Sequence, residues 1–131
     1  MAGYVASLVL AGGKGTRLGK DKLSTVVGDQ PLLQRVINAV SLISKSIFVV
    51  TAKGQEIKLP DTMQNKVILV SDIYPGIGAL GGIHAGLVAS DCRYNLALAA
   101  DMPFLNPGLL RYLVEISLGF DVVMPRVSGN I

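Results

Sequence analysis

Strand-like and helix-like segments alternate along almost the whole chain, and this alternation limits the possible folds more than any other feature. Apolar stretches rich in β-branched residues, typical of buried strands, occupy residues 4–10, 46–51, 66–70, 94–100 and 121–125. Helical patterning lies at 31–43, 81–90 and 107–118, and Pro31 suits a helix start. The polar residues 51–66 suggest a short helix or a loop. The order predicts an α/β fold of three α/β/α layers with a Rossmann-like, mostly parallel central sheet.

Composition narrows the class of protein further. The length of 131 residues suits one domain, and 50% hydrophobic against 5% aromatic residues indicates a core of Val, Leu, Ile and Ala. No apolar run approaches the roughly 20 residues of a membrane helix, so we expect no membrane partner. The N-terminus lacks the basic region of a signal peptide, and Cys92 is the single cysteine. Together these features favour a cytoplasmic protein without an internal disulfide.

A glycine-rich stretch with the sequence GGKGTRLG follows the first predicted strand, at residues 12–19. Lys14, Arg17, Lys20 and Lys22 lie within nine residues of one another. Glycines let backbone N–H groups face an anion, and cationic side chains add full charges to those dipoles. In parallel α/β sheets, this first strand-to-helix loop is a favoured phosphate site. The stretch therefore predicts a phosphate-bearing ligand, whereas the broad basic stripe of a nucleic-acid-binding protein is absent.

Three kinds of phosphate-binding loop could account for this stretch. No window satisfies the Walker pattern G-x-x-x-x-G-K-[ST]. A dinucleotide-binding loop would need an acidic residue at the end of the next strand, but residues 50–53 read VTAK. Residues 10–22, LAGGKGTRLGKDK, instead look like the nucleotidyltransferase signature L-A-G-G-x-x-x-R-[ML]-G-x-x-K. This third template predicts a nucleoside triphosphate as the ligand.

Two later motifs follow strands in the same way. Residues 71–83, SDIYPGIGALGGI, place Asp72 and several backbone amides where they could read a base edge or a ribose hydroxyl. Residues 98–105, LAADMPFL, end a hydrophobic strand on Asp101, whose carboxylate could hold Mg²⁺ together with triphosphate oxygens and water. Taken singly, each motif could be an ordinary turn. Their shared position after strands favours a common site.

The three motifs, in this order and spacing, resemble the molybdenum cofactor guanylyltransferases of the nucleotidyltransferase superfamily, over about residues 5–125. The resemblance implies the nucleotide-diphospho-sugar transferase type of fold. It also implies transfer of GMP from Mg·GTP to the phosphate of a molybdopterin-type acceptor, with release of pyrophosphate. Molybdoenzyme maturation proteins are partners that such a role would suggest.

The resemblance also implies roles for individual residues. Lys22 would reach the phosphates, Asp72 would make a further nucleotide contact, and Asp101 would bind Mg²⁺. Thr51 stands where relatives often carry Asn, as a polar nucleotide contact. The remaining nucleotide contacts would come from Leu10, Ala11, Gly12 and Gly13.

These roles agree with the chemistry of nucleotidyl transfer, in which the protein mainly positions groups and neutralises charge. Lys22, with a metal ion on Asp101, would stabilise charge on the α-phosphate, and Arg17 would stabilise the departing pyrophosphate. The attacking phosphate is already anionic, so no general base is needed. His84 and Cys92 are therefore interpreted as packing or surface residues.

Family members continue into a C-terminal half with an N-x-x-x-P-x-D/E-L stretch that helps to bind the acceptor, and nothing similar occurs here. We therefore expect residues 1–131 to form a single nucleotidyltransferase domain that lacks its C-terminal acceptor-binding portion. Two alternatives stay open. One is a related nucleotidyltransferase that uses CTP or another acceptor such as a sugar phosphate, although cytidylyl relatives tend to carry L-A-A-G. The other is a non-catalytic nucleotide-binding module.

Overall fold

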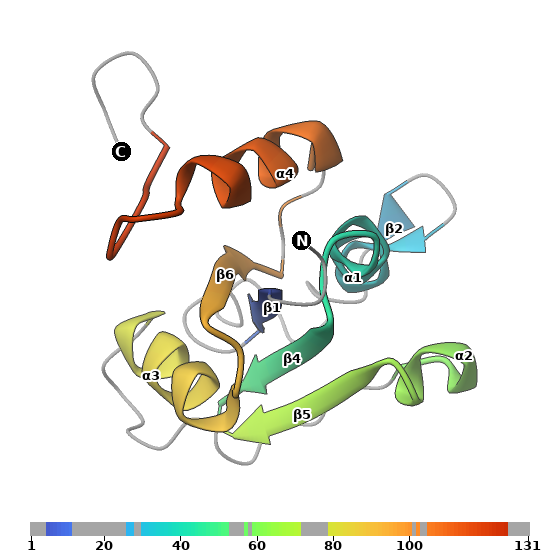
Figure 1. Cartoon of the computed structure of the whole chain (residues 1–131). Coiled ribbons are helices and arrows are strands. Elements are labelled where there is room, and N and C mark those ends of the chain that lie inside the picture. Colours follow the sequence, from blue (N-terminus) through green and yellow to red (C-terminus); the bar gives the residue numbers. More distant parts are fainter. Residues whose placement is uncertain are drawn as a thin grey trace.

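A parallel sheet forms the centre of the domain. The computed structural model describes residues 5–11, 26–27, 30–52, 57, 59–71, 79–100, 102 and 105–125. Within these residues the sheet has the strand order β5-β4-β1-β6, and all three pairings are parallel (Figure 1). The strands are β1 (Val5–Leu10), β4 (Ser46–Thr51), β5 (Val67–Ser71) and β6 (Tyr94–Ala99). The expected parallel sheet is confirmed.

Helices cover both faces of this sheet, so the three-layer prediction is also confirmed (Figure 1). On one face lie α1 (Leu32–Ser41) and α4 (Pro107–Ile116), which contact each other. On the other face α3 (Ala79–Ala89) lies across β4, β1 and β5. The single turn α2 (Asp61–Gln64) precedes β5, within the segment expected to hold a short helix or a loop.

Alternate residues of the central strands supply two apolar layers, as expected for a sheet that is buried on both faces. Val9 and Val49 point into the layer beneath α1, which also contains Val36 and Ile37. Leu8 and Phe48 belong to the opposite, smaller cluster on the side of α3. Because β1 and β4 each lie between two other strands, both are buried along almost their whole length.

A small antiparallel pair precedes α1, and the sequence reading did not anticipate it. β2 (Val26–Val27) pairs with β3 (Gln30–Pro31). Pro31 therefore ends β3 and the helix begins at Leu32, so the prediction that Pro31 starts the helix was wrong by one residue. The proline ring fixes φ at a value that suits both an edge strand and a helix entry, which explains the ambiguity.

The predicted strand at residues 121–125 is not formed. Those residues are described, but they belong to no helix or strand. Val122 and Met124 are 74% and 61% exposed, so neither side chain is buried against the rest of the domain. A strand depends on a hydrogen-bonded neighbour, and a local sequence pattern alone does not supply one.

Candidate functional site

The carboxyl ends of four parallel strands meet at one edge of the sheet. Strand register places Leu10 of β1 between Val50 of β4 and Ala99 of β6, and pairs Thr51 with Ser71 of β5. Each of the three sequence motifs therefore follows a strand end at the same edge. In open α/β sheets this is the edge where ligands bind.

The order of the strands also marks a position along that edge. From β1 the chain passes through α1 to β4 on one side, and it later returns through α3 to β6 on the opposite side of β1. Ligands bind in the crevice formed where strand order reverses in this way. In this sheet the strand order reverses between β1 and β6, and the glycine-rich stretch begins directly after β1.

Two backbone hydrogen bonds extend the sheet beyond the formal strand ends. The Ala11 N–H donates to the Val50 carbonyl oxygen at 2.8 Å, and the Ala100 N–H donates to the Leu10 carbonyl oxygen at 3.0 Å. Ala11 and Ala100 are 3% and 1% exposed. The backbone is therefore held in place up to the residues directly before Gly12 and Asp101.

Thr51 ends β4 at the same edge and is 8% exposed. Its hydroxyl donates to the Val70 carbonyl oxygen at 3.4 Å, a long hydrogen bond. A hydroxyl that donates one proton keeps its oxygen lone pairs, so Thr51 can still accept a hydrogen bond from a nucleotide. A contact between Thr51 and a nucleotide stays a prediction.

The described residues bring together only part of the predicted site. Leu10, Ala11 and Thr51 lie at the carboxyl edge of neighbouring strands β1 and β4, as expected. The other predicted residues fall outside the described residues: Gly12, Gly13, Arg17, Lys22, Asp72 and Asp101. In the described part of the chain, no group of three or more His, Cys, Asp or Glu residues could hold a metal ion.

Other features of the site region were missed by the sequence reading. Val50 and Ala100 hold the end of β1 through backbone hydrogen bonds. Such bonds do not depend on side-chain type, so the sequence pattern could not indicate them. Gly82 of α3 lies against the side chain of Leu10. Its spacing of four residues from Gly86, on one helical face, was a signal that could have indicated a close contact between helix and sheet.

Sequence comparison gives the same family as the motifs. A family model described as the MobA-like NTP transferase domain matches residues 7–131. A probable molybdenum cofactor guanylyltransferase from Pelotomaculum thermopropionicum is 36% identical over 121 residues, which cover 91% of this chain and 56% of the relative. Another so named, from Peptoclostridium acidaminophilum, is 33% identical over 84% of this chain and 48% of its own length. The chain thus spans about half the length of these relatives.

Comparison with solved structures establishes the fold. A nucleotidyl transferase from Methanothermobacter superposes with a TM-score of 0.71 at 22% identity, over 86% of this chain and 57% of that one. The 2-C-methyl-D-erythritol 4-phosphate cytidylyltransferase from Thermus thermophilus gives 0.61 at 16% identity, over 96% and 59% of the respective chains. The predicted nucleotide-diphospho-sugar transferase fold is confirmed.

The helices of the described part of the chain are all too short, or insufficiently apolar, to cross a membrane. The family model matches residues 7–131, a range that includes the strand ends that carry the candidate site. The chain therefore belongs to the MobA-like NTP transferase family.

Proposed function

We propose that this domain binds Mg·GTP as part of an enzyme that transfers GMP to the phosphate of a molybdopterin-type acceptor and releases pyrophosphate. One observation carries the proposal. The Ala100–Leu10 hydrogen bond holds the two strand ends that precede Asp101 and the glycine-rich stretch side by side, and the Ala11–Val50 bond ties the end of β1 to β4. The guanylyltransferase names of relatives up to 36% identical support the choice of GTP.

The proposed catalytic residues act by neutralising charge. Lys22 and Arg17 are cationic partners for the α-phosphate oxygens and the departing pyrophosphate, respectively. The acceptor phosphate needs no deprotonation before it attacks, so proton transfer is not part of the proposed chemistry. The proposed nucleotide contacts are Leu10, Ala11, Gly12, Gly13, Lys22, Thr51, Asp72 and Asp101.

Asp101 is the proposed metal-binding residue. It directly follows Ala100, whose position is fixed by the hydrogen bond to Leu10. Mg²⁺ prefers oxygen ligands, and proteins commonly bind it through one or two carboxylates while phosphates and water complete the octahedron. A single carboxylate directly after a fixed strand end is consistent with this mode of Mg²⁺ binding. When bound, the metal would supply electrostatic stabilisation of the triphosphate.

The setting of the reaction is also proposed. Residues 1–131 would form a single nucleotidyltransferase domain, and acceptor binding would depend on a C-terminal portion that this sequence lacks. The support is that the chain covers only 48–64% of several similar relatives. We further propose a cytoplasmic location, contact with molybdoenzyme maturation proteins, and no nucleic-acid partner.

Titration calorimetry with GTP, CTP and UTP, each with and without Mg²⁺, tests which nucleotide the domain binds and whether binding requires the metal ion. We expect selective, magnesium-dependent binding of GTP. Selective binding of CTP would replace the guanylyl proposal with a cytidylyl one. Binding without turnover, when acceptor and the longer protein are supplied, would identify a non-catalytic module. Binding of none of the three would contradict the proposal.

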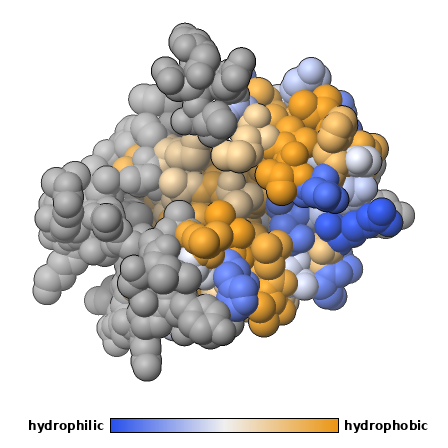
Figure 2. Space-filling view, turned by 90° about the vertical axis from the view of Figure 1, so that its left-hand side faces the viewer, coloured by the Kyte–Doolittle hydropathy of each residue, from blue (hydrophilic) through white to orange (hydrophobic). Residues whose placement is uncertain are grey.

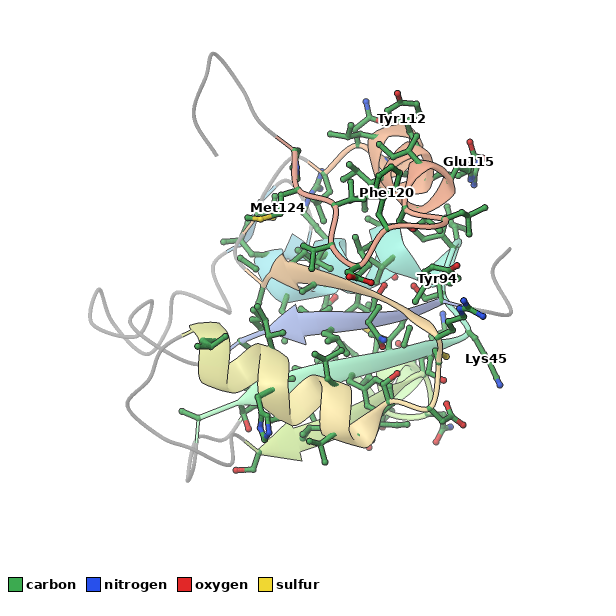
Figure 3. The ribbon with its side chains drawn as sticks, turned by 60° about the vertical axis from the view of Figure 1, so that its left-hand side comes forward. Lys45, Tyr94, Tyr112, Glu115, Phe120 and Met124 are labelled. Atoms are coloured by element: carbon green, nitrogen blue, oxygen red, sulfur yellow. The ribbon has the colours of Figure 1, made fainter. Side chains whose placement is uncertain are left out.

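Two variants test the residues. Lys22→Ala and Asp101→Asn should each weaken Mg·GTP binding by about 1.5–3 kcal/mol, the range for hydrogen bonds to charged groups. Lys45→Ala is the matched control, because exposed Lys45 precedes β4 at the opposite, amino edge of the sheet (Figure 3). Equal losses in Lys22→Ala and Lys45→Ala would indicate a general charge effect and contradict the assigned site.

A further inference from the structure

Helix α3 packs against β1, and at residue 82 it presents a glycine to the end of that strand. A Cβ atom placed on Gly82 would lie 3.2 Å from Leu10 Cδ2 and 3.7 Å from Val50 Cγ1. The first distance is shorter than ordinary van der Waals contact, so any side chain at this position would displace Leu10 or the helix.

Leu10 and Val50 are also the two residues whose carbonyl groups hold the strand ends at the candidate site. The Val50 carbonyl accepts from Ala11, and the Leu10 carbonyl accepts from Ala100. A Cβ on residue 82 would therefore touch the side chains of both residues that fix where the glycine-rich stretch and the Asp101 segment begin. A displacement of Leu10 would reach Ala100 through its hydrogen bond to the Leu10 carbonyl, and Ala11 through the peptide bond that joins it to Leu10.

We propose that Gly82 is a positioning residue for the nucleotide site: its lack of a side chain sets the distance between α3 and the carboxyl end of β1. This inference rests on the proposed binding of Mg·GTP. Gly82 need not touch the nucleotide in this role. It acts through Leu10, and the close contact keeps the Ala11 and Ala100 hydrogen bonds in register.

Gly86 provides a matched control within the same helix. A Cβ on Gly86 would lie 3.0 Å from Leu8 Cδ1 and Cδ2, and 3.2 Å from Leu8 Cγ, so this contact is tighter than the one at Gly82. Leu8 is fully buried in the middle of β1. Gly86→Ala should therefore disturb the packing of α3 without acting directly on the strand end.

The experiment compares Gly82→Ala with Gly86→Ala in this chain. Mg·GTP affinity is measured by calorimetry, thermal unfolding gives stability, and hydrogen exchange is measured at the Ala11 and Ala100 amides. We expect Gly82→Ala to weaken Mg·GTP binding about threefold to tenfold, as expected for a displacement of a few tenths of an ångström at a binding site, and to speed exchange at both amides. Gly86→Ala should lower the unfolding temperature at least as much, with affinity unchanged within about twofold.

A second variant separates the contact from a general loss of stability. Valine has no Cδ atoms, so Leu10→Val removes the atom nearest to position 82. Adding Gly82→Ala to Leu10→Val should then cause no further loss of affinity and no further increase in amide exchange. Additive losses would overturn the inference, because they would show that Gly82 acts independently of Leu10.

Other outcomes are equally decisive. If Gly86→Ala weakened binding as much as Gly82→Ala, the effect would follow helix packing in general and the inference would be wrong. If Gly82→Ala left affinity unchanged, a positioning role for the nucleotide would be excluded. If the unaltered chain bound no GTP, the proposed function would fail by itself, and amide exchange in the two variants would still decide whether Gly82 fixes the end of β1.

Discussion

Ser7 is the single polar residue of β1, and it is fully buried in the centre of the sheet. Its hydroxyl shares a hydrogen bond with the hydroxyl of Ser44, which precedes β4, at 2.5 Å. The two residues are 37 positions apart in the chain, so no local pattern in the sequence could reveal this pair. The sequence pattern did place Leu10, Ala11 and Thr51 at strand ends, whereas their contacts with a nucleotide stay predictions.

Removal of one hydroxyl of this pair should lower the free energy of unfolding more than removal of both hydroxyls. Ser44→Ala leaves the Ser7 hydroxyl buried without this partner, and we expect a loss of about 1–3 kcal/mol in the free energy of unfolding. The double variant Ser7→Ala with Ser44→Ala should lose less free energy of unfolding than Ser44→Ala alone, because it leaves no buried hydroxyl without a hydrogen-bond partner. Urea denaturation of both variants measures the difference. A double variant that is the less stable of the two would contradict this account.

At the scale of elements, the start of α4 was predicted more accurately than its end. Pro107 occupies the first turn as expected, and the Asn106 side chain caps the helix by accepting from the backbone N–H groups of Gly108 and Leu109 at 2.8 Å and 3.4 Å. The helix was expected to reach residue 118, but it ends at Ile116. Ser117 turns its hydroxyl back to the Val114 carbonyl, and Gly119 takes a positive φ of 88°. A glycine of this kind indicates an approximate end only.

The cap of α4 gives a prediction at the same scale. Asn106→Ala should lower the free energy of unfolding by about 1 kcal/mol, because two N–H groups of the first turn lose their acceptor. Asn106→Asp is the control and should retain most of the stability, since a carboxylate also accepts these bonds. Thermal unfolding, followed by circular dichroism, compares the three proteins. Equal stability of Asn106→Ala and the unaltered chain would show that the cap contributes nothing.

At the scale of the whole molecule, alternation of segments was enough to predict a three-layer fold, because a buried parallel sheet requires apolar strands and covering helices. The strand order β5-β4-β1-β6 was beyond such reasoning, since β6 pairs with a strand almost 90 residues earlier in the chain. The wrong prediction of a strand at residues 121–125 has the same cause. These residues do have the apolar pattern of a strand, but strand pairing depends on the assembled sheet and cannot be read from a local pattern.

That apolar pattern now lies on the surface. Apolar residues form much of the face seen in Figure 2, and Tyr112, Phe120 and Met124 project from α4 and the segment after it (Figure 3). Phe120 and Val122 are 67% and 74% exposed. Monomeric proteins rarely expose large contiguous apolar patches, and such patches promote association. We therefore expect this chain to associate as its concentration rises.

Replacing both side chains should reduce that association without loss of fold. Phe120→Ser with Val122→Ser removes two mostly exposed apolar groups, so the unfolding temperature should change little while light scattering at high concentration falls. Val114→Ser is the contrasting variant, because Val114 lies on the inner face of α4 at 8% exposure and its replacement should destabilise the domain by about 1–3 kcal/mol. If the double variant melted as early as Val114→Ser, residues 120 and 122 would be part of the core. Unchanged scattering with unchanged stability would instead place the self-associating surface elsewhere on the molecule.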